Sequence, residues 1–158
     1  MYILKEVGKL NISKLNAVAR ILSACGKDMA EKYDLHHWDN LYIKTLLIVC
    51  LCNLKNKIYI LFDDGKAVAT FMTKQRGDAL HFEKLGTLPS ESGKGIGSFC
   101  MNKIEEIAKG SNCKKVVMEV YEPSQHAISF YKHKGYEVTG MTDTLKYKEL
   151  IMEKRINK

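Results

Sequence analysis

The stretch between residues 92 and 98 carries three glycines at alternate positions, directly before a helical pattern. Its residues are Ser92, Gly93, Lys94, Gly95, Ile96, Gly97 and Ser98. Glycines remove the side chains that would hold a ligand away from the backbone, and the first amides of a helix have no partners within it. Because the helix dipole adds positive charge there, as do Lys94 and Lys103, the stretch suits a phosphate or pyrophosphate. A glycine-rich turn without a ligand is the alternative.

Two well-known phosphate loops do not fit these glycines. A Walker A loop needs four residues between its first glycine and a Gly-Lys-Ser/Thr, and no register supplies this spacing. The dinucleotide fingerprint GxGxxG fails because its last position falls on Ser98 or Cys100. What remains is a shorter GxG pattern that follows an extended run ending at Pro89.

The chain resembles the GNAT superfamily of N-acetyltransferases at this loop and again downstream. The family loop reads Gln/Arg-x-x-Gly-x-Gly/Ala, and its positions are occupied by Ser92, Gly95 and Gly97. A second family motif reads Asn-x-x-Ala-x-x-x-Tyr-x-x-x-Gly-Phe. Its positions are occupied by Ser124, Ala127, Tyr131, Gly135 and Tyr136. Serine replaces the first residue of both motifs, but two motifs in the right order are more specific than either alone.

The resemblance covers residues 68–155 and implies an α/β (α+β) fold, with a mixed, mostly antiparallel sheet of about seven strands and helices on both faces. We expect a single GNAT-like domain over residues 1–158. The resemblance further implies that acetyl-CoA is the cosubstrate and that the loop wraps its pyrophosphate. The implied cofactor-binding residues are Leu85, Gly86, Thr87, Ser92, Gly93, Lys94, Gly95, Ile96, Gly97, Ser98, Ser124 and Tyr131.

Acetyl transfer requires a base for the attacking amine, a donor to the developing oxyanion and an acid for the departing thiolate. By resemblance, a backbone amide between Leu85 and Thr87 serves the oxyanion and Tyr131 serves as the acid. Glu119, an acid within an apolar run, is the first candidate for the base, although it could equally face solvent. His81 and Glu83, which share one face of the preceding strand, are the runners-up and would act through a water.

The implied reaction is acetyl transfer to a primary amine by direct attack in a ternary complex. The alternative is a catalytically inactive acetyl-CoA-binding sensor or regulatory module. The class of the acceptor amine is left open by the sequence. An early loop with His36, His37 and Trp38 would either line the acceptor pocket or, for the tryptophan, pack in the core.

Composition and charge limit the partners and the compartment that we expect for this protein. The 158 residues carry 25 Lys and Arg against 18 Asp and Glu, a net charge of +7. The basic residues are scattered without a groove-reading motif, so nucleic acid is an unlikely partner, and the charge favours a polyanionic cofactor. Five cysteines without a CxxC pair predict a reduced, cytoplasmic protein with no structural metal. We expect a monomer or homodimer. The longest apolar run, residues 46–52, is too short to span a bilayer, so no membrane partner is expected.

The elements that must position these residues follow from periodicity and turn signals. A strand is expected at 2–10, then a helix capped by Ser13, and then a helix over 41–53 capped by Asp39. The run 46–52 could instead be a buried strand. Strands at 57–62 and 66–74 are joined by an Asp-Asp-Gly hairpin turn, and the later elements follow from similar signals. These are a strand at 79–88, a helix at 98–109 that stops at Gly110, a strand at 114–121, a helix at 124–133, and closing strands at 136–141 and 145–155.

Overall fold

The computed structural model describes residues 1–157, which form two compact units. The first unit combines residues 1–74 with 84–102, and the second combines residues 75–83 with the chain from 103 onward. Three elements run from one unit into the other: β3 (Lys66–Arg76), β4 (Ala79–Thr87) and α3 (Ile96–Gly110). The binding and catalytic residues that the sequence predicts are therefore divided between two bodies.

Seven strands form one sheet in the order β1-β2-β3-β4-β5-β7-β6 within the described residues. The remaining strands are β1 (Tyr2–Glu6), β2 (Lys57–Asp63), β5 (Lys115–Tyr121), β6 (Glu137–Asp143) and β7 (Lys148–Arg155). The β4–β5 pair is parallel, whereas β1–β2, β2–β3, β5–β7 and β6–β7 are antiparallel. The predicted mixed, mostly antiparallel sheet of about seven strands is confirmed.

In the first unit, the β2–β3 hairpin turns where the sequence predicts it. Asp64 and Gly65 have φ angles of +46° and +85°, the left-handed pair that a tight hairpin turn requires. The strands pair from Lys57 opposite Thr73 to Asp63 opposite Lys66, with one register shift after Leu61.

Two helices complete this unit, α1 (Ile12–Tyr33) and α2 (Tyr42–Lys55). The predicted cap of α1 is wrong by two residues: Asn11, not Ser13, accepts a hydrogen bond from the amide of Lys14 at 3.2 Å. Asp39 does not cap α2 either, because the helix begins after Leu41 with no side-chain cap. The strand alternative for residues 46–52 is also wrong.

The helical period of α2 is visible in its buried side chains, Thr45, Val49 and Asn53, which are four residues apart. Val49 is fully buried in a cluster with side chains from α1 and from strands β2 and β3. The other buried members of this cluster are Val7, Leu15, Val18, Ala19, Leu22, Ile58, Ile60 and Met72. Burial against α1 and the sheet therefore selects helix over strand for this apolar segment.

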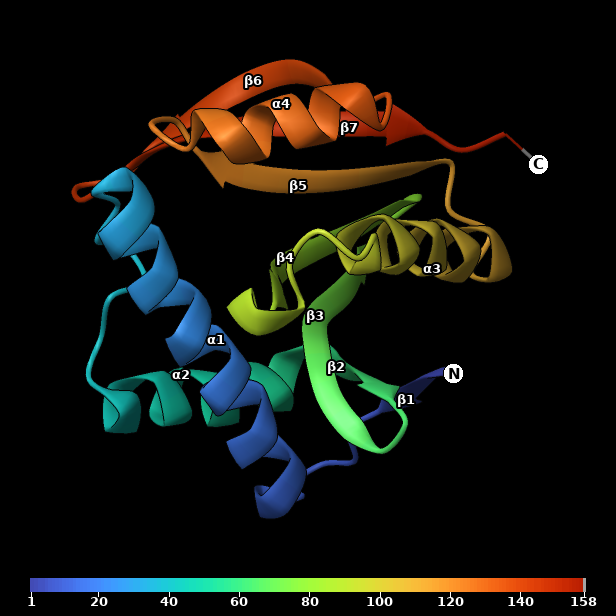
Figure 1. The fold of residues 1–158 in the computed structure, drawn as a ribbon. Coiled ribbons are helices and arrows are strands. Elements are labelled where there is room, and N and C mark those ends of the chain that lie inside the picture. Colours follow the sequence, from blue (N-terminus) through green and yellow to red (C-terminus); the bar gives the residue numbers. More distant parts are fainter. Residues whose placement is uncertain (158) are drawn as a thin grey trace. The chain divides into compact units, whose positions relative to one another are not determined.

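The second unit contains β5, β6, β7, the first residues of β4 and α4 (Gln125–His133). β4 pairs with β5 from Ala79 opposite Lys115 to His81 opposite Val117. β7 lies between β5 and β6, so the closing strands do not extend the sheet in chain order (Figure 1). This arrangement places His81 beside the strand that carries Glu119.

Candidate active site

The glycine loop connects β4 to α3 in the predicted order of strand, loop and helix. After β4, a short 3₁₀ helix, Pro89–Glu91, leads through a turn into α3, which begins two residues before the predicted Ser98. Gly93 and Gly95 have φ angles of +79° and +77°, which explains why glycine stands at both positions. A Cβ added to either glycine would enter open space, with no atom within 4 Å. The loop thus presents bare backbone, with open space beside it that side chains would otherwise occupy.

The amides of this loop lie at the start of a helix. The amide of Phe99 donates to the carbonyl of Gly95 at 3.0 Å, which is the first bond of α3. The preceding amides of Ile96, Gly97 and Ser98 belong to the first turn, where a helix offers no acceptor. These donors, together with the helix dipole, fit the pyrophosphate of acetyl-CoA.

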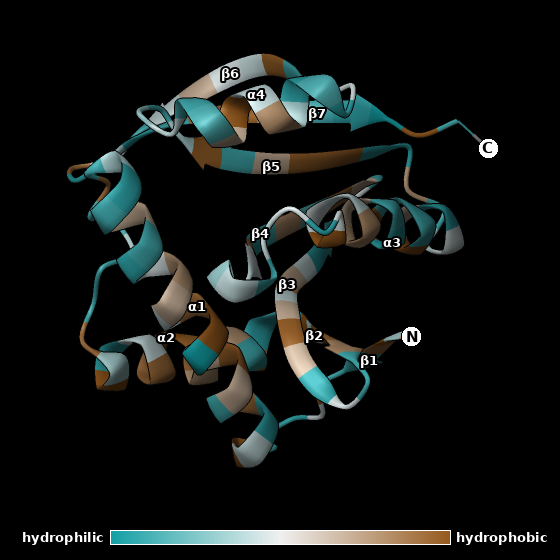
Figure 2. Ribbon diagram, in the orientation of Figure 1, coloured by the Kyte–Doolittle hydropathy of each residue, from teal (hydrophilic) through white to brown (hydrophobic). Residues whose placement is uncertain are grey.

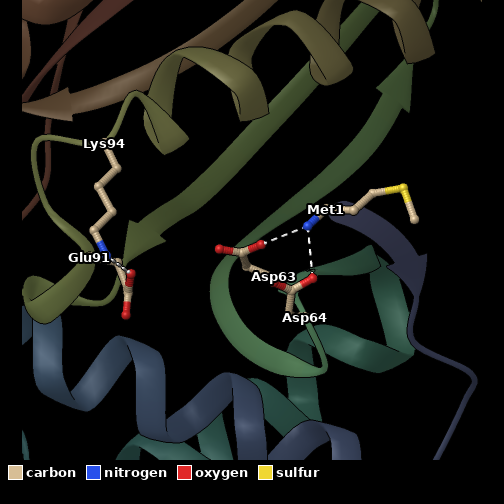
Figure 3. Close-up of polar contacts among 5 residues, drawn as sticks. All are labelled: Met1, Asp63, Asp64, Glu91 and Lys94. Atoms are coloured by element: carbon tan, nitrogen blue, oxygen red, sulfur yellow. Dashed lines mark hydrogen bonds and ion pairs between the residues drawn. The ribbon is translucent and has the colours of Figure 1, made fainter.

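Glu91 holds the loop by two ion pairs, a contact that the sequence analysis missed. Its carboxylate accepts from Lys66 at 2.7 Å and from Lys94 at 2.6 Å, the second of which Figure 3 shows. These two ammonium groups lower the pKa of Glu91 to about 2. Lys94 is therefore already paired, and the backbone amides remain the loop's main attraction for an anion. Glu91 and Lys94 are three residues apart, a spacing that allows an ion pair and could have been recognised in the sequence. The second partner, Lys66 on β3, is brought to Glu91 only by the fold.

The end of β4 is held against α1 inside the first unit. The Cys25 thiol donates to the carbonyl of Thr87 at 3.2 Å, and a Cβ on Gly86 would lie 3.0 Å from the same sulfur. Burial raises the pKa of Cys25 to about 12, so its thiol stays protonated and able to donate. Lys84, with φ of +51°, bends the strand just before this segment. Cys25 is a positioning residue that only tertiary packing reveals.

Tyr131 lies in the second unit among other aromatic rings. Its ring centroid is 5.9 Å from that of Phe82, 5.3 Å from that of Phe130 and 6.2 Å from that of Tyr136. Its hydroxyl has no hydrogen-bond partner within residues 1–157. Burial raises the pKa of Tyr131, so the phenol is protonated at neutral pH and is a weaker acid than a free phenol.

Tyr136, which replaces the phenylalanine of the family motif, is structural. It is 2% exposed, and its hydroxyl donates to Glu105 at 3.4 Å. Lys154 donates to the same carboxylate at 2.9 Å. Burial and this carboxylate raise the pKa of Tyr136. The two tyrosines of this cluster thus differ in hydrogen bonding: the Tyr136 hydroxyl is bonded to Glu105, whereas the Tyr131 hydroxyl is available to a ligand.

The candidate bases lie on neighbouring strands of the second unit. His81 is opposite Val117, so it shares a face of the sheet with Glu119. Burial, Arg76 and Lys115 lower the pKa of His81, whereas Glu119 acts in the opposite direction. His81 is therefore neutral near pH 7 and able to accept a proton. Glu119 and Glu83 are exposed, so both carboxylates are open to solvent.

The remaining predicted positions are a serine and the early loop. Ser124 is 3% exposed and precedes α4, but its side chain makes no capping hydrogen bond. In the first unit, Trp38 packs against the core cluster, and its carbonyl would clash with a Cβ on Gly26. His36 pairs with Asp34 at 2.7 Å and with Asp39 at 3.4 Å, which raises its pKa. Trp38 therefore takes the packing role that the sequence left open.

Residues 1–157 were also compared with what a metal site, a disulfide or a membrane-spanning helix requires. No group of three or more His, Cys, Asp or Glu side chains there could hold a metal ion. All five cysteines, which lie in this range, are free thiols. No helix in this part of the chain is long and apolar enough to cross a membrane.

The first unit thus gathers the glycine loop and residues 85–87, and the second gathers Tyr131, His81, Glu119 and Ser124. A profile of the acetyltransferase (GNAT) family matches residues 15–136, more than half of the chain. The chain belongs to the GNAT family. It is therefore an acyltransferase of the N-acetyltransferase type, in a family whose fold uses acetyl-CoA.

Solved GNAT structures share the fold at low sequence identity. The PaiA N-acetyltransferase from Thermoplasma acidophilum, solved with coenzyme A, matches 98% of this chain and 99% of its own, with TM-score 0.78 and 18% identity. The ribosomal-protein-S18-alanine N-acetyltransferase from Escherichia coli matches 100% of this chain and 96% of its own, with TM-score 0.75 and 15% identity. The uncharacterized protein YxbD of Bacillus subtilis is 24% identical over 112 residues, or 71% of this chain and 69% of YxbD.

Proposed function

We propose that this GNAT protein transfers the acetyl group of acetyl-CoA to a primary amine by direct attack in a ternary complex. The observation that carries the proposal is the bare backbone of Gly93 and Gly95 at the start of α3, where both φ angles are positive and open space lies at the Cβ positions. Acetyl-CoA supplies the thioester, and this chain supplies the groups that bind it and move protons. We propose that residues 1–158 make up a single acetyltransferase domain.

The loop binds the pyrophosphate through backbone amides from Gly93 to Ser98. Their attraction for an anion depends on the helix start and not on one side chain, so the serine at position 92 removes one contact without removing these amides. Leu85, Gly86 and Thr87 bind the acetyl end, where a backbone amide faces the developing oxyanion. The Cys25 thiol fixes this segment through the Thr87 carbonyl. Ser124 contributes a buried hydroxyl to the same cofactor.

His81 and Glu119 prepare the amine. An attacking amine must be neutral, so a proton leaves its nitrogen for a base, directly or through a water. Glu119 is the first candidate for this base, and His81, neutral at pH 7 and on the same face of the sheet, is the second. Glu83, also exposed at the end of this face, is the third.

Tyr131 completes the reaction. As the nitrogen–carbon bond forms, the carbon–sulfur bond breaks and the coenzyme A thiolate takes a proton from the Tyr131 hydroxyl. The hydroxyl has no other hydrogen-bond partner within residues 1–157, which leaves it available for this transfer. Burial makes it a weak acid, so the proton moves only as negative charge develops on sulfur.

The test is an acetyl-transfer assay with acetyl-CoA against amines of several classes, read as release of free thiol. Transfer to at least one amine is expected, with a wild-type rate that exceeds hydrolysis of acetyl-CoA. Binding of acetyl-CoA without transfer to any amine class would instead support the inactive sensor, an alternative favoured by the serines at both motif starts. Failure to bind acetyl-CoA would contradict both.

The free cysteines support a reducing, cytoplasmic location. Analytical sedimentation distinguishes a monomer from a homodimer.

A further inference from the structure

The outward face of α2 carries a row of exposed aliphatic side chains. The core side of the helix is formed by the buried Thr45, Val49 and Asn53, with the partly buried Leu46, Cys50 and Cys52 packed against the core cluster. The exposed row consists of Ile43, Leu47, Leu51 and Leu54, which are between 59% and 64% exposed. Their spacing of four, four and three places them on one stripe of the helix. Figure 2 shows hydrophobic residues along the α2 ribbon. Exposed apolar rows of this kind mark interaction surfaces.

Contacts to the rest of the first unit fix the rotation of α2 about its axis. Val49 is fully buried in the core cluster. The hydroxyl of Tyr42 donates to the side chain of Asn16 on α1. At the other end, the amide of Leu10 donates to the side chain of Asn53 at 3.0 Å. The helix therefore cannot turn its leucines inward without losing these contacts, and the row stays on the surface.

The charged side chains of α2 itself are lysines, and the nearest acidic residue before the helix in the sequence is Asp39. Residues 40–62 contain no Asp or Glu, and neither do residues 7–27. Lys44 and Lys55 each follow a member of the row by one position, so both lie along the same edge of it. Lys9 is held at the end of α2, where its ammonium donates to the carbonyl of Asn56 at 3.4 Å. The apolar row thus has a basic border.

We infer that the outer face of α2 binds an anionic lipid surface. The helix would lie parallel to that surface, with its aliphatic row among the acyl chains and its lysines at the anionic headgroups. Lysine stems reach past an apolar surface while their charges stay in water. This mode needs no spanning helix, so it does not conflict with a longest apolar run of seven residues.

Two protein occupants fit the face less well. Protein interfaces draw their binding energy mainly from Trp, Tyr and Arg, whereas lysine is depleted in them and leucine is uncommon among their strongest contacts. The row is aliphatic, with lysines beside it and no aromatic side chain among its four members. A second copy of the chain would also bring the basic borders of two helices close together.

Co-sedimentation of the full chain with vesicles tests this inference. We expect binding to phosphatidylcholine vesicles that contain phosphatidylglycerol, weak binding to phosphatidylcholine alone, and loss of binding as salt is raised. The double substitution Leu47→Ser and Leu51→Ser should weaken binding at least about tenfold, because two large aliphatic groups leave the bilayer. Lys44→Gln with Lys55→Gln should remove most of the preference for phosphatidylglycerol.

The matched control is Leu145→Ser, which changes a fully exposed leucine of the second unit and should bind like the wild type. Circular dichroism shows whether each variant is folded, and acetyl-CoA binding by each variant is measured separately. Wild-type protein that ignores anionic vesicles, or a folded leucine variant that binds them equally well, would overturn the inference. So would light scattering that shows a wild-type dimer and a monomeric leucine variant, because the row would then be a self-association surface.

Discussion

The glycine loop and the candidate catalytic residues differ in which part of the chain would do the work. The loop at the start of α3 offers its backbone, because Gly93 and Gly95 leave open space where side chains would stand. The candidates in the second unit offer side chains, with Tyr131 buried among aromatic rings and Glu119 exposed on a strand. The proposed function therefore predicts that binding and chemistry can be separated by mutation. Changes in the loop should alter affinity for acetyl-CoA, whereas changes in the second unit should alter the rate.

The largest expected effect on rate comes from Tyr131→Phe. Because the phenol acts only as the thiolate leaves, kcat should fall about 10²-fold or more while the Kd for acetyl-CoA stays nearly unchanged. Steady-state kinetics with a calorimetric Kd measures both. The matched control is Tyr136→Phe in the same cluster, which loses a hydrogen bond to Glu105 and should lower stability without a comparable fall in kcat. Equal kinetics of the two variants would show that Tyr131 is a packing residue.

The pH profile should separate His81 from Glu119. Burial and neighbouring cations lower the pKa of His81 below its ordinary 6.5, so a histidine base would place the acidic limb of kcat/KM below pH 6.5. Glu119→Gln removes the charge that raises this pKa, which should move that limb to still lower pH. His81→Gln should abolish the limb. If Glu119 is the base, the opposite holds: its variant loses the limb, and His81→Gln keeps it.

Cys25→Ala should have a moderate effect on stability and affinity. It removes the thiol donor to Thr87 and leaves a gap beside Gly86, at a cost of about 1 kcal/mol or somewhat more in the free energy of unfolding. The KM for acetyl-CoA should rise as residues 85–87 loosen. Cys25→Ser, which keeps a donor, should recover part of the KM. A KM that is unchanged in both variants would remove the positioning role.

The smallest expected effect belongs to Glu91→Gln. Its two ion pairs persist as pH falls until the carboxylate titrates at about pH 2, so they are intact throughout the range of any assay. The substitution frees Lys66 and Lys94, which should tighten acetyl-CoA binding by less than about fivefold and increase its dependence on salt. Titrations at two salt concentrations measure this change. A large loss of affinity would mean that Glu91 orders the loop more than its lysines attract phosphate.

Much of the fold could be predicted because local signals agree with tertiary packing. The Asp-Asp-Gly turn, the glycine loop and the helical spacing of Cys100, Ile104 and Ala108 each depend on neighbouring residues only. The cap of α1 was wrong because Asn11 is as suitable as Ser13, and the cap of α2 was wrong because that helix begins after Leu41 with no side-chain cap at all. The insertion of β7 between β5 and β6 is a long-range choice that periodicity does not encode.

The candidate site shows the same division. Motif spacing gives Gly95, Gly97 and Tyr131 as candidates, and their roles in binding and catalysis stay predictions. Cys25 and the Lys66–Glu91 pair were missed because their partners lie far apart in sequence, 62 and 25 positions respectively. A thiol and a surface lysine carry no sequence signal for these partners. Contacts between residues far apart in the sequence are therefore found from the structure, whereas the candidate groups come from the spacing of motifs.

The central claim is that backbone amides at the start of α3 bind the pyrophosphate of acetyl-CoA. Titration calorimetry of Gly95→Val against Gly65→Val tests it most directly, because both glycines have left-handed φ angles and open space at Cβ, and only Gly95 lies in the loop. The two variants bear similar backbone strain. We predict that folded Gly95→Val loses acetyl-CoA binding while Gly65→Val keeps the wild-type Kd. Wild-type affinity in Gly95→Val would contradict the claim.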